Sequence, residues 1–185
     1  RPPSFSSIML KYSQVPFTVN QFVTYNDFNF KDQSHNIKQE HRLVQPFEPF
    51  KEENPALYLA FPSALPQKPI TVYFRMEEEE QAPDANLFME EPFAEEGMSE
   101  RKKRDLKASQ RVVWEYWNGK VWTNVYPRDE TRNFTRSGAI EFTGPKDMLK
   151  KREFGEELFW VRGRLEMGSY SKSPWCIDLR LNTAP

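Results

Sequence analysis

Apolar and polar side chains alternate with a period of two over several short stretches of this 185-residue chain. Because the side chains of a strand point alternately to opposite faces, this alternation predicts half-buried β-strands. In the last stretch it places Trp175, Ile177, Leu179 and Leu181 together on one face, opposite Cys176. The clearest stretches are Ala56 to Phe61, Ile70 to Met76, Ala139 to Thr143, Leu158 to Glu166 and Trp175 to Leu181.

The aromatic stretch from Arg111 to Val125 consists of two apolar runs joined by Asn118-Gly119. Asn and Gly accept positive φ more readily than other residues, so this dipeptide predicts a tight antiparallel hairpin. Alternation along the first arm places Trp114 on one face and Glu115 and Trp117 on the other.

The segments between these strands are rich in proline, glycine and charge. We expect an edge strand within Arg1 to Asn20, a loop or irregular connector from Phe22 to His41, and a charged connection with at most one helical turn over Lys146 to Gly155. About seven or eight strands with no long helix favour an all-β fold, an antiparallel β-sandwich forming a single domain over residues 1–185. A closed barrel is the alternative, because alternation does not separate the two.

One long segment, Glu77 to Gln110, differs in composition from the rest of the chain. It begins with four glutamates, ends near Arg101-Lys102-Lys103-Arg104, and contains prolines that argue against a continuous helix. Charged blocks of this kind usually stay solvated, which predicts a mobile surface insertion. The alternative is an arm that contacts a partner through apolar anchors such as Phe88 and Phe93.

The overall charge and the absence of apolar runs restrict the classes of function. A formal net charge of -1 gives no general attraction to nucleic acid, and no apolar run approaches the ~20 residues that span a bilayer. We therefore expect no nucleic-acid partner, no membrane insertion and no signal peptide, which favours the cytoplasm. We interpret the lone Cys176 as a small structural residue. Because the first residue is Arg1 and not methionine, we expect the chain to be a fragment of a larger protein.

Motifs that carry catalysis or hold metals are not evident in the sequence. His35 and His41 are six residues apart, which does not fit the i, i+4 spacing of helical zinc ligands. The strand acids Glu115, Glu141 and Asp178 would form a catalytic pair only if folding brought two of them to ~5–10 Å. Phosphate-binding glycine loops and the nucleophile elbow are missing, so we expect no enzyme, no cofactor and no metal.

The five tryptophans divide by the face on which the alternation places them. Trp114, Trp122 and Trp175 lie in register with aliphatic residues and are expected in the core. Trp117 and Trp160 lie on the opposite faces of their strands and are the better surface candidates. With Arg162 and Arg164, Trp160 would form an aromatic and cationic stripe, which in a carbohydrate-binding β-sandwich would stack against sugars.

Several segments, taken in order, resemble motifs of one protein family and together cover about half the chain. The first arm of the hairpin has the form W-x-Y-W, and Asp129, Thr131, Thr135, Ser137 and Gly138 follow a D-x-T-x-x-x-T-x-S-G pattern. The sequence is similar in these places to the baseplate J-like proteins of contractile phage tails and related bacterial injection machines. The segments are PALYLAFPSALPQKPITVYF at 55–74, WEYWNGKVW at 114–122, DETRNFTRSGAIEFTGP at 129–145, FGEELFWVRGRLEMGSY at 154–170 and LRLNT at 179–183.

This resemblance implies an inserted, non-catalytic β-sandwich module of a longer baseplate protein, in a cytoplasmic assembly or a phage-like particle. Its partners would be other baseplate or tail subunits, and the insertion at 77–110 departs from the family pattern. The alternative is a carbohydrate-binding module for adhesion, with a glycan as ligand, and a hydrolase comes third. The candidate contact residues are Trp117, Trp160, Arg162, Arg164, Arg132 and Arg136, with Arg128 beside them.

Overall fold

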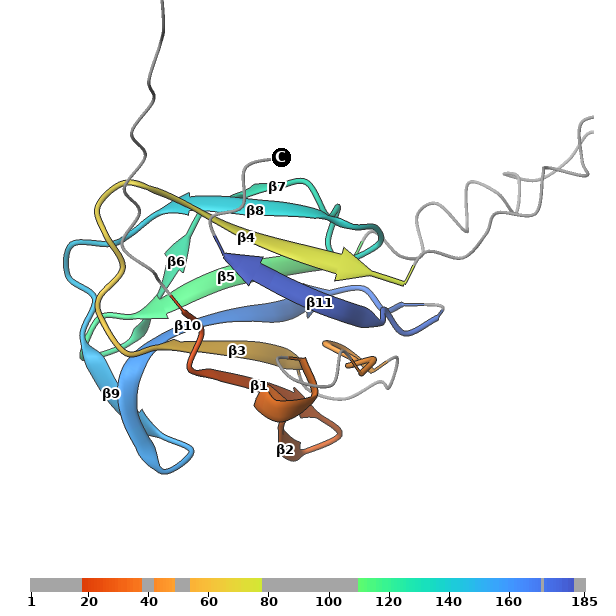
Figure 1. The fold of residues 1–185 in the computed structure, drawn as a ribbon, viewed down its shortest axis with the longest axis horizontal. Helices are drawn as coiled ribbons and strands as arrows, with labels where there is room; N and C mark the ends of the chain where they lie inside the picture. The colour runs from red at the N-terminus through yellow and green to blue at the C-terminus, as the bar shows by residue number, and fades with distance from the viewer. Residues whose placement is uncertain (1–17, 38–41, 49–53, 78–109, 171, 182–185) are drawn as a thin grey trace, which may run out of the picture.

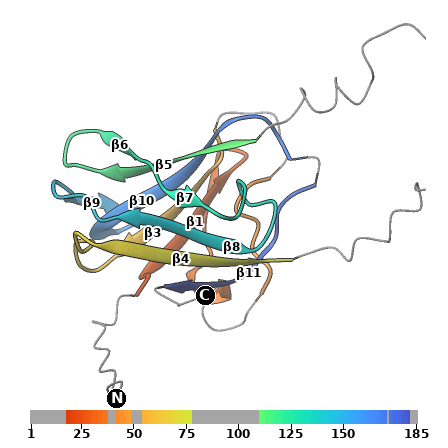
Figure 2. The ribbon, with the colours of Figure 1, turned by 90° about the horizontal axis from the view of Figure 1, so that it is seen from above.

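The computed structural model describes residues 18–37, 42–48, 54–77, 110–170 and 172–181. In this part of the chain, eleven strands form two antiparallel sheets that face each other, as Figures 1 and 2 show from two directions. The expected all-β sandwich is confirmed, and the two separate sheets exclude the closed barrel. The strand number exceeds the seven or eight expected, because short strands were not evident from alternation.

The larger sheet, sheet A, has the strand order β2-β1-β3-β10-β5-β6, and β9 pairs with the first part of β10. Leu149 N donates to Trp117 O at 3.1 Å, just where β9 begins and β5 ends. The two strands therefore abut end to end beside β10. The bounds are β1 Gln21–Asn26, β2 Asn29–Asp32, β3 Ala56–Phe61, β5 Arg111–Trp117, β6 Trp122–Val125, β9 Lys150–Glu153 and β10 Glu156–Met167.

The smaller sheet, sheet B, has the order β11-β4-β8-β7. Its strands are β4 Pro69–Met76, β7 Arg128–Asp129, β8 Gly138–Thr143 and β11 Cys176–Leu181. The chain passes repeatedly between the sheets, so that most strands pair with partners distant in sequence. A close approach at one crossing requires glycine, since a Cβ on Gly144 would lie 2.2 Å from Pro66 O.

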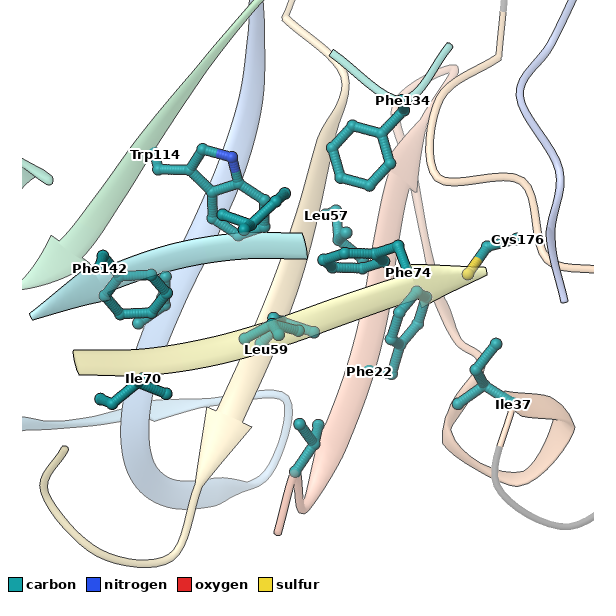
Figure 3. Packing of buried hydrophobic residues seen from close by; sticks show 14 of the residues in the cluster. Phe22, Ile37, Leu57, Leu59, Ile70, Phe74, Trp114, Phe134, Phe142 and Cys176 are labelled. Atoms are coloured by element: carbon teal, nitrogen blue, oxygen red, sulfur yellow. The ribbon is translucent and has the colours of Figure 1, made fainter. Parts of the chain in front are cut away.

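The core between the sheets contains the residues that alternation placed on the apolar faces of β3, β4, β5, β8 and β10. The Phe74 ring packs against Trp114 and Phe134, with ring centroids 6.2 Å and 5.0 Å apart (Figure 3). Phe47 also packs against Phe134, edge to face, with ring centroids 5.2 Å apart. Burying several large aromatic rings in one cluster provides much of the hydrophobic stabilisation of a sandwich of this size.

Three hairpin turns differ from the sequence expectations. The Asn118-Gly119 hairpin forms, but its loop has four residues, 118–121, with Asn118 Oδ1 accepting from Lys120 N and Val121 N. Two-residue turns with positive φ occur instead at Asp27-Phe28 and at Phe154-Gly155. The expected connector after Phe22 is thus the β1–β2 hairpin, and the charged connection includes β9.

The last strand also corrects the expected assignment of faces. Cys176, which was placed opposite Leu179 and Leu181, is fully buried in the same core that these leucines pack against, whereas Trp175 is only half-buried. The reason is a register shift between Cys176 and Asp178. One extra residue in a strand inverts the alternation on one side of the bulge, and nothing in the apolar pattern marks its position.

Two predicted segments lie mostly or wholly outside the described residues. They are the edge strand within 1–20, of which only residues 18–20 are described, and the interior of the 77–110 insertion. Within the described residues, no helix is long and apolar enough to span a bilayer.

Candidate functional site

The outer face of sheet A carries a second apolar cluster, on the side turned away from sheet B. Ala56, Tyr58 and Ala60 of β3 point there, because the residues that alternate with them fill the central core. Trp160 of β10 lies beside them and is fully buried. The cluster contains Val23, Ala56, Tyr58, Ala60, Leu158 and Trp160, with Tyr25, Trp122 and Phe154 packed against it.

Two hairpins fold over this face and bury the cluster. Phe30 on β2 and Phe154 in the β9–β10 turn meet with ring centroids 5.0 Å apart, and both rings contact Tyr58 edge to face. In Figure 1 β2 and the β9–β10 hairpin extend from the same side of the molecule. Phe30 remains 49% exposed, so the cluster reaches the surface as an aromatic patch.

Toward β6 the patch becomes cationic as well as aromatic. Trp117 and Trp122, directly opposite each other on β5 and β6, have ring centroids 5.7 Å apart and planes inclined at 67°. Lys151 Nζ lies 4.6 Å from the Trp117 ring and 5.2 Å from the Trp122 ring. Arg162 Cζ lies 4.2 Å from the Trp122 ring, so cations interact with both indoles.

A buried carboxylate organises the arginines of this face. Glu115 is 6% exposed and accepts from Arg162 Nε at 2.7 Å and from Arg164 Nε at 3.4 Å. Arg162 is the cross-strand neighbour of Glu115, so the pair follows directly from the register of β5 and β10. The guanidinium of Arg162 is thereby fixed between the carboxylate and the Trp122 ring. We use the name cationic aromatic face for Trp117, Trp122, Lys151, Arg162 and Arg164 together with Glu115.

Trp160 is the one predicted surface residue that the structure places wholly in the interior. Its ring lies on the expected outer face, but it is covered by the hairpin that carries Phe154, and its Nε1 donates to Lys151 O at 2.9 Å. The expectation that Trp160 is exposed is therefore wrong. Trp122, expected in the central core, instead packs on this outer face.

The remaining candidates do not form one site. Arg162 and Arg164 lie on the same face of sheet A as Trp117, whereas Arg132 and Arg136 lie in the loop between β7 and β8 of sheet B. Both loop arginines are exposed. Sequence reasoning missed Lys151, Phe30 and Phe154, because they lie in stretches interpreted as connectors. Gly155 was a weak sequence signal for this turn, because Phe-Gly is not a typical hairpin pair.

The loop that bears Arg132 has an unusual backbone. Arg132, Asn133 and Phe134 have φ values of 51°, 56° and 62°, which form one left-handed turn. The Asp129 carboxylate accepts from Thr131 N at 2.8 Å and from Asn133 N at 2.9 Å, and so occupies the concave side of the turn. Successive backbone N–H groups in such turns attract anions, and here the anion is supplied by the chain itself.

This left-handed turn also joins distant elements. Asn133 Oδ1 accepts from Val112 N of β5 at 2.9 Å, and Asn133 O accepts from the hydroxyl of Tyr170 at 2.8 Å. Burial raises the pKa of the Tyr170 hydroxyl above its ordinary value, with a further contribution from the charge of Asp129. The Asn133 side chain is thus engaged in the fold, although Asn133-Phe134-Thr135 matches the triplet for N-glycosylation.

The side chains that could take part in a reaction are held in structural interactions or lie far apart. Burial raises the pKa of the Cys176 thiol to about 12, and its Sγ contacts Asp178 O at 3.4 Å. Glu141 is opposite Thr71 and Asp178 is opposite Arg75. These partners are four residues apart on β4, or ~13 Å along the strand, which exceeds the separation of paired catalytic carboxylates.

Among the described residues, no group of three or more His, Cys, Asp and Glu side chains is arranged to hold a metal ion. No protein-family model matches the chain, and no curated protein matches it either.

Proposed function

We propose that this chain is a non-catalytic structural module of a phage-like or contractile-injection baseplate protein, which contributes surface contacts within the assembly. The motif resemblance supports the family, and the cationic aromatic face supports a role in contact with another subunit. Its partner would be a neighbouring baseplate or tail protein that presents carboxylates and apolar groups.

The cationic aromatic face is the observation that carries the proposal. Tryptophan, tyrosine and arginine are the residues that most often dominate binding energy at protein interfaces. On this face Arg162 is fixed before any partner binds, because Glu115 and the Trp122 ring hold it. Ordering side chains in advance reduces the entropy lost on association. The outer face of sheet B differs, since Thr71 and Tyr73 of β4 lie there opposite Glu141 and Ala139 of β8.

The geometry of the tryptophans favours a protein partner over a glycan. A sugar stacks on an open and flat aromatic surface, but the Trp117 and Trp122 planes are inclined at 67°. Lys151 and Arg162 also lie over these rings at 4.2 to 5.2 Å. A sugar would have to displace a cation that already interacts with the indole, whereas a carboxylate on a protein surface would gain from it.

The test is to tag the chain in the cells that encode it, isolate sheathed particles by sedimentation and measure the share of tagged protein in the particle fraction. We expect the wild-type chain to sediment with the particles. Trp117→Ala and Lys151→Ala should lower that share, with apparent affinity falling roughly tenfold or more. The control is Lys68→Ala, which removes an exposed lysine in the β3–β4 loop.

Thermal melts of each purified variant separate lost contacts from lost folding. A wild-type chain that stays out of every particle fraction would exclude the baseplate role. Saturable binding to a glycan array, abolished by Trp122→Ala with the melt unchanged, would instead support the carbohydrate-binding alternative. Trp160→Ala is unsuitable for either test, because this ring is buried.

A further inference from the structure

The strands at the ends of the two sheet orders differ in how they are protected from pairing with other chains, and β9, which pairs only with β10, consists of charged residues. Natural edge strands are guarded by charge, shortness, bulges or a covering segment. Edge β2 carries Lys31 and Asp32, and edge β7 has only two residues, both charged. Edge β11 has a bulge after Cys176, and Val44 is bridged to that residue by two backbone hydrogen bonds.

Edge β6 is also short, but in the described part of the chain it has no charge, no bulge and no covering segment. Its sequence, Trp-Thr-Asn-Val, contains no charge and no proline, and its pairing with β5 is regular. The strand lies at the margin of sheet A (Figure 2). Two exposed apolar residues flank it, Val121 at 59% and Tyr126 at 86% exposure. An uncharged edge between exposed apolar side chains favours pairing with another strand.

The register identifies the backbone groups that are available for such pairing. Asn118 N donates to Val121 O, so residues 118 and 121 form a hydrogen-bonded pair. Because bonded and non-bonded pairs alternate in an antiparallel ladder, the pairs made by Trp122 and Asn124 with β5 are non-bonded. The N–H and C=O groups of these two residues therefore point away from β5, toward the open edge. The bond from Leu149 N to Trp117 O agrees, since it shows that Trp117 O also faces away from β6.

We propose that β6 is a self-association edge, through which two copies of the chain pair antiparallel about a twofold axis at Asn124. This register uses the outward groups of Trp122 and Asn124 in both copies and continues sheet A across the dimer. It also places Trp122 of each copy opposite the exposed Tyr126 of the other, and cross-strand aromatic pairs are favourable. The inference is independent of the proposed baseplate role.

A second copy fits this edge for reasons of charge and symmetry. A twofold axis at Asn124 brings identical residues together, which is unfavourable for charged side chains but acceptable for an amide. The paired stretch ends at Tyr126, because Arg128 already belongs to sheet B. A contact of this length is smaller than a standard interface, so we expect a dissociation constant that is roughly micromolar or weaker.

Sedimentation velocity over a concentration series that reaches the millimolar range tests the proposal. The wild-type chain should shift from one toward two chain masses. Asn124→Lys places two like charges on the axis, and Asn124→Pro removes an outward N–H that β5 does not use. Each should weaken dimerisation roughly tenfold or more, and Tyr126→Ser should weaken it less.

The control is Asn29→Lys, which adds the same charge at the opposite edge of sheet A. Near-ultraviolet circular dichroism of every variant reports whether the tryptophan environment is retained. A wild-type chain that stays monomeric throughout would overturn the proposal. Dimerisation that persists in folded Asn124→Lys, or that is lost equally in Asn29→Lys, would overturn it as well.

Discussion

Replacing Phe134 with alanine should destabilise the protein by about 3–5 kcal/mol, the usual cost of removing a fully buried phenylalanine ring. Phe134 is 1% exposed, and its ring lies 5.0 Å from Phe74 and 6.2 Å from Trp114. It is also the last residue of the left-handed turn, whose three non-glycine residues each cost ~1–2 kcal/mol. The burial of this ring therefore offsets a strain of comparable size.

The balance between ring burial and backbone strain sets an upper limit on the stability that Phe134→Ala loses. Once the Phe134 ring is removed, the turn can return to ordinary φ values and release part of its strain energy. The loss of stability in Phe134→Ala should therefore not exceed about 5 kcal/mol. Urea unfolding followed by tryptophan fluorescence measures it, and Trp114, stacked near Phe134, reports on the site directly. The dependence of the unfolding free energy on urea should remain unchanged, because the same surface is exposed on unfolding.

The matched control is Arg132→Gly, at an exposed position in the same turn with φ of 51°. Glycine removes ~1–2 kcal/mol of left-handed strain and adds ~0.5–1 kcal/mol of chain entropy, so stability should stay the same or rise by up to about 1.5 kcal/mol. A loss below about 1.5 kcal/mol for Phe134→Ala, or a clear loss for Arg132→Gly, would refute the reasoning that burial holds a strained turn.

Three further outcomes are expected. Glu115→Gln leaves two arginines largely buried without their carboxylate, and urea unfolding should show a loss of about 2 kcal/mol, the usual cost of a lost charged hydrogen bond; a loss below about 0.5 kcal/mol would contradict the structural role. The Cys176 pKa is raised from 9.0 to about 12, so the unfolded chain loses this proton first and stability falls as the pH rises through that interval. Cys176→Ala should flatten this fall, as urea midpoints at about pH 8 and about pH 10.5 would show. Gly144→Ala must displace Pro66 O, which its Cβ would approach to 2.2 Å, and a melting temperature equal to wild type would contradict that contact.

The regular part of the fold could be predicted because each face of its strands meets a distinct environment. In β10, Val161 and Leu165 enter the central core while Trp160 and Arg162 point to the other side, as alternation indicated. The alternation could not show that the second side is also covered. Whether Trp160 is exposed depends on Phe154, which reaches it only through the β9–β10 hairpin.

The turns and the bulge could not be predicted, because they depend on the backbone angles of single residues. Asp27-Phe28 makes a hairpin turn although phenylalanine rarely adopts positive φ, and the bulge after Cys176 leaves no trace in the apolar pattern. The candidate site was predicted in part, since Trp117, Arg162 and Arg164 lie together. The site also includes Lys151, which lies over the Trp117 ring. Lys151 belongs to a short strand of charged residues that apolar alternation does not reveal.

The position of β10 in sheet A has a consequence for synthesis of the chain on the ribosome. This strand pairs with β3, β5 and β9, yet it emerges roughly 100 residues after β3. At a translation rate of ~5–20 residues per second, β3 waits ~5–20 s for its partner, which is long compared with hydrophobic collapse. Throughout that interval the apolar strand Ala56–Phe61 is a nascent segment whose native neighbour on one side does not yet exist. We therefore expect this strand to be most prone to pairing with other chains before β10 has been made.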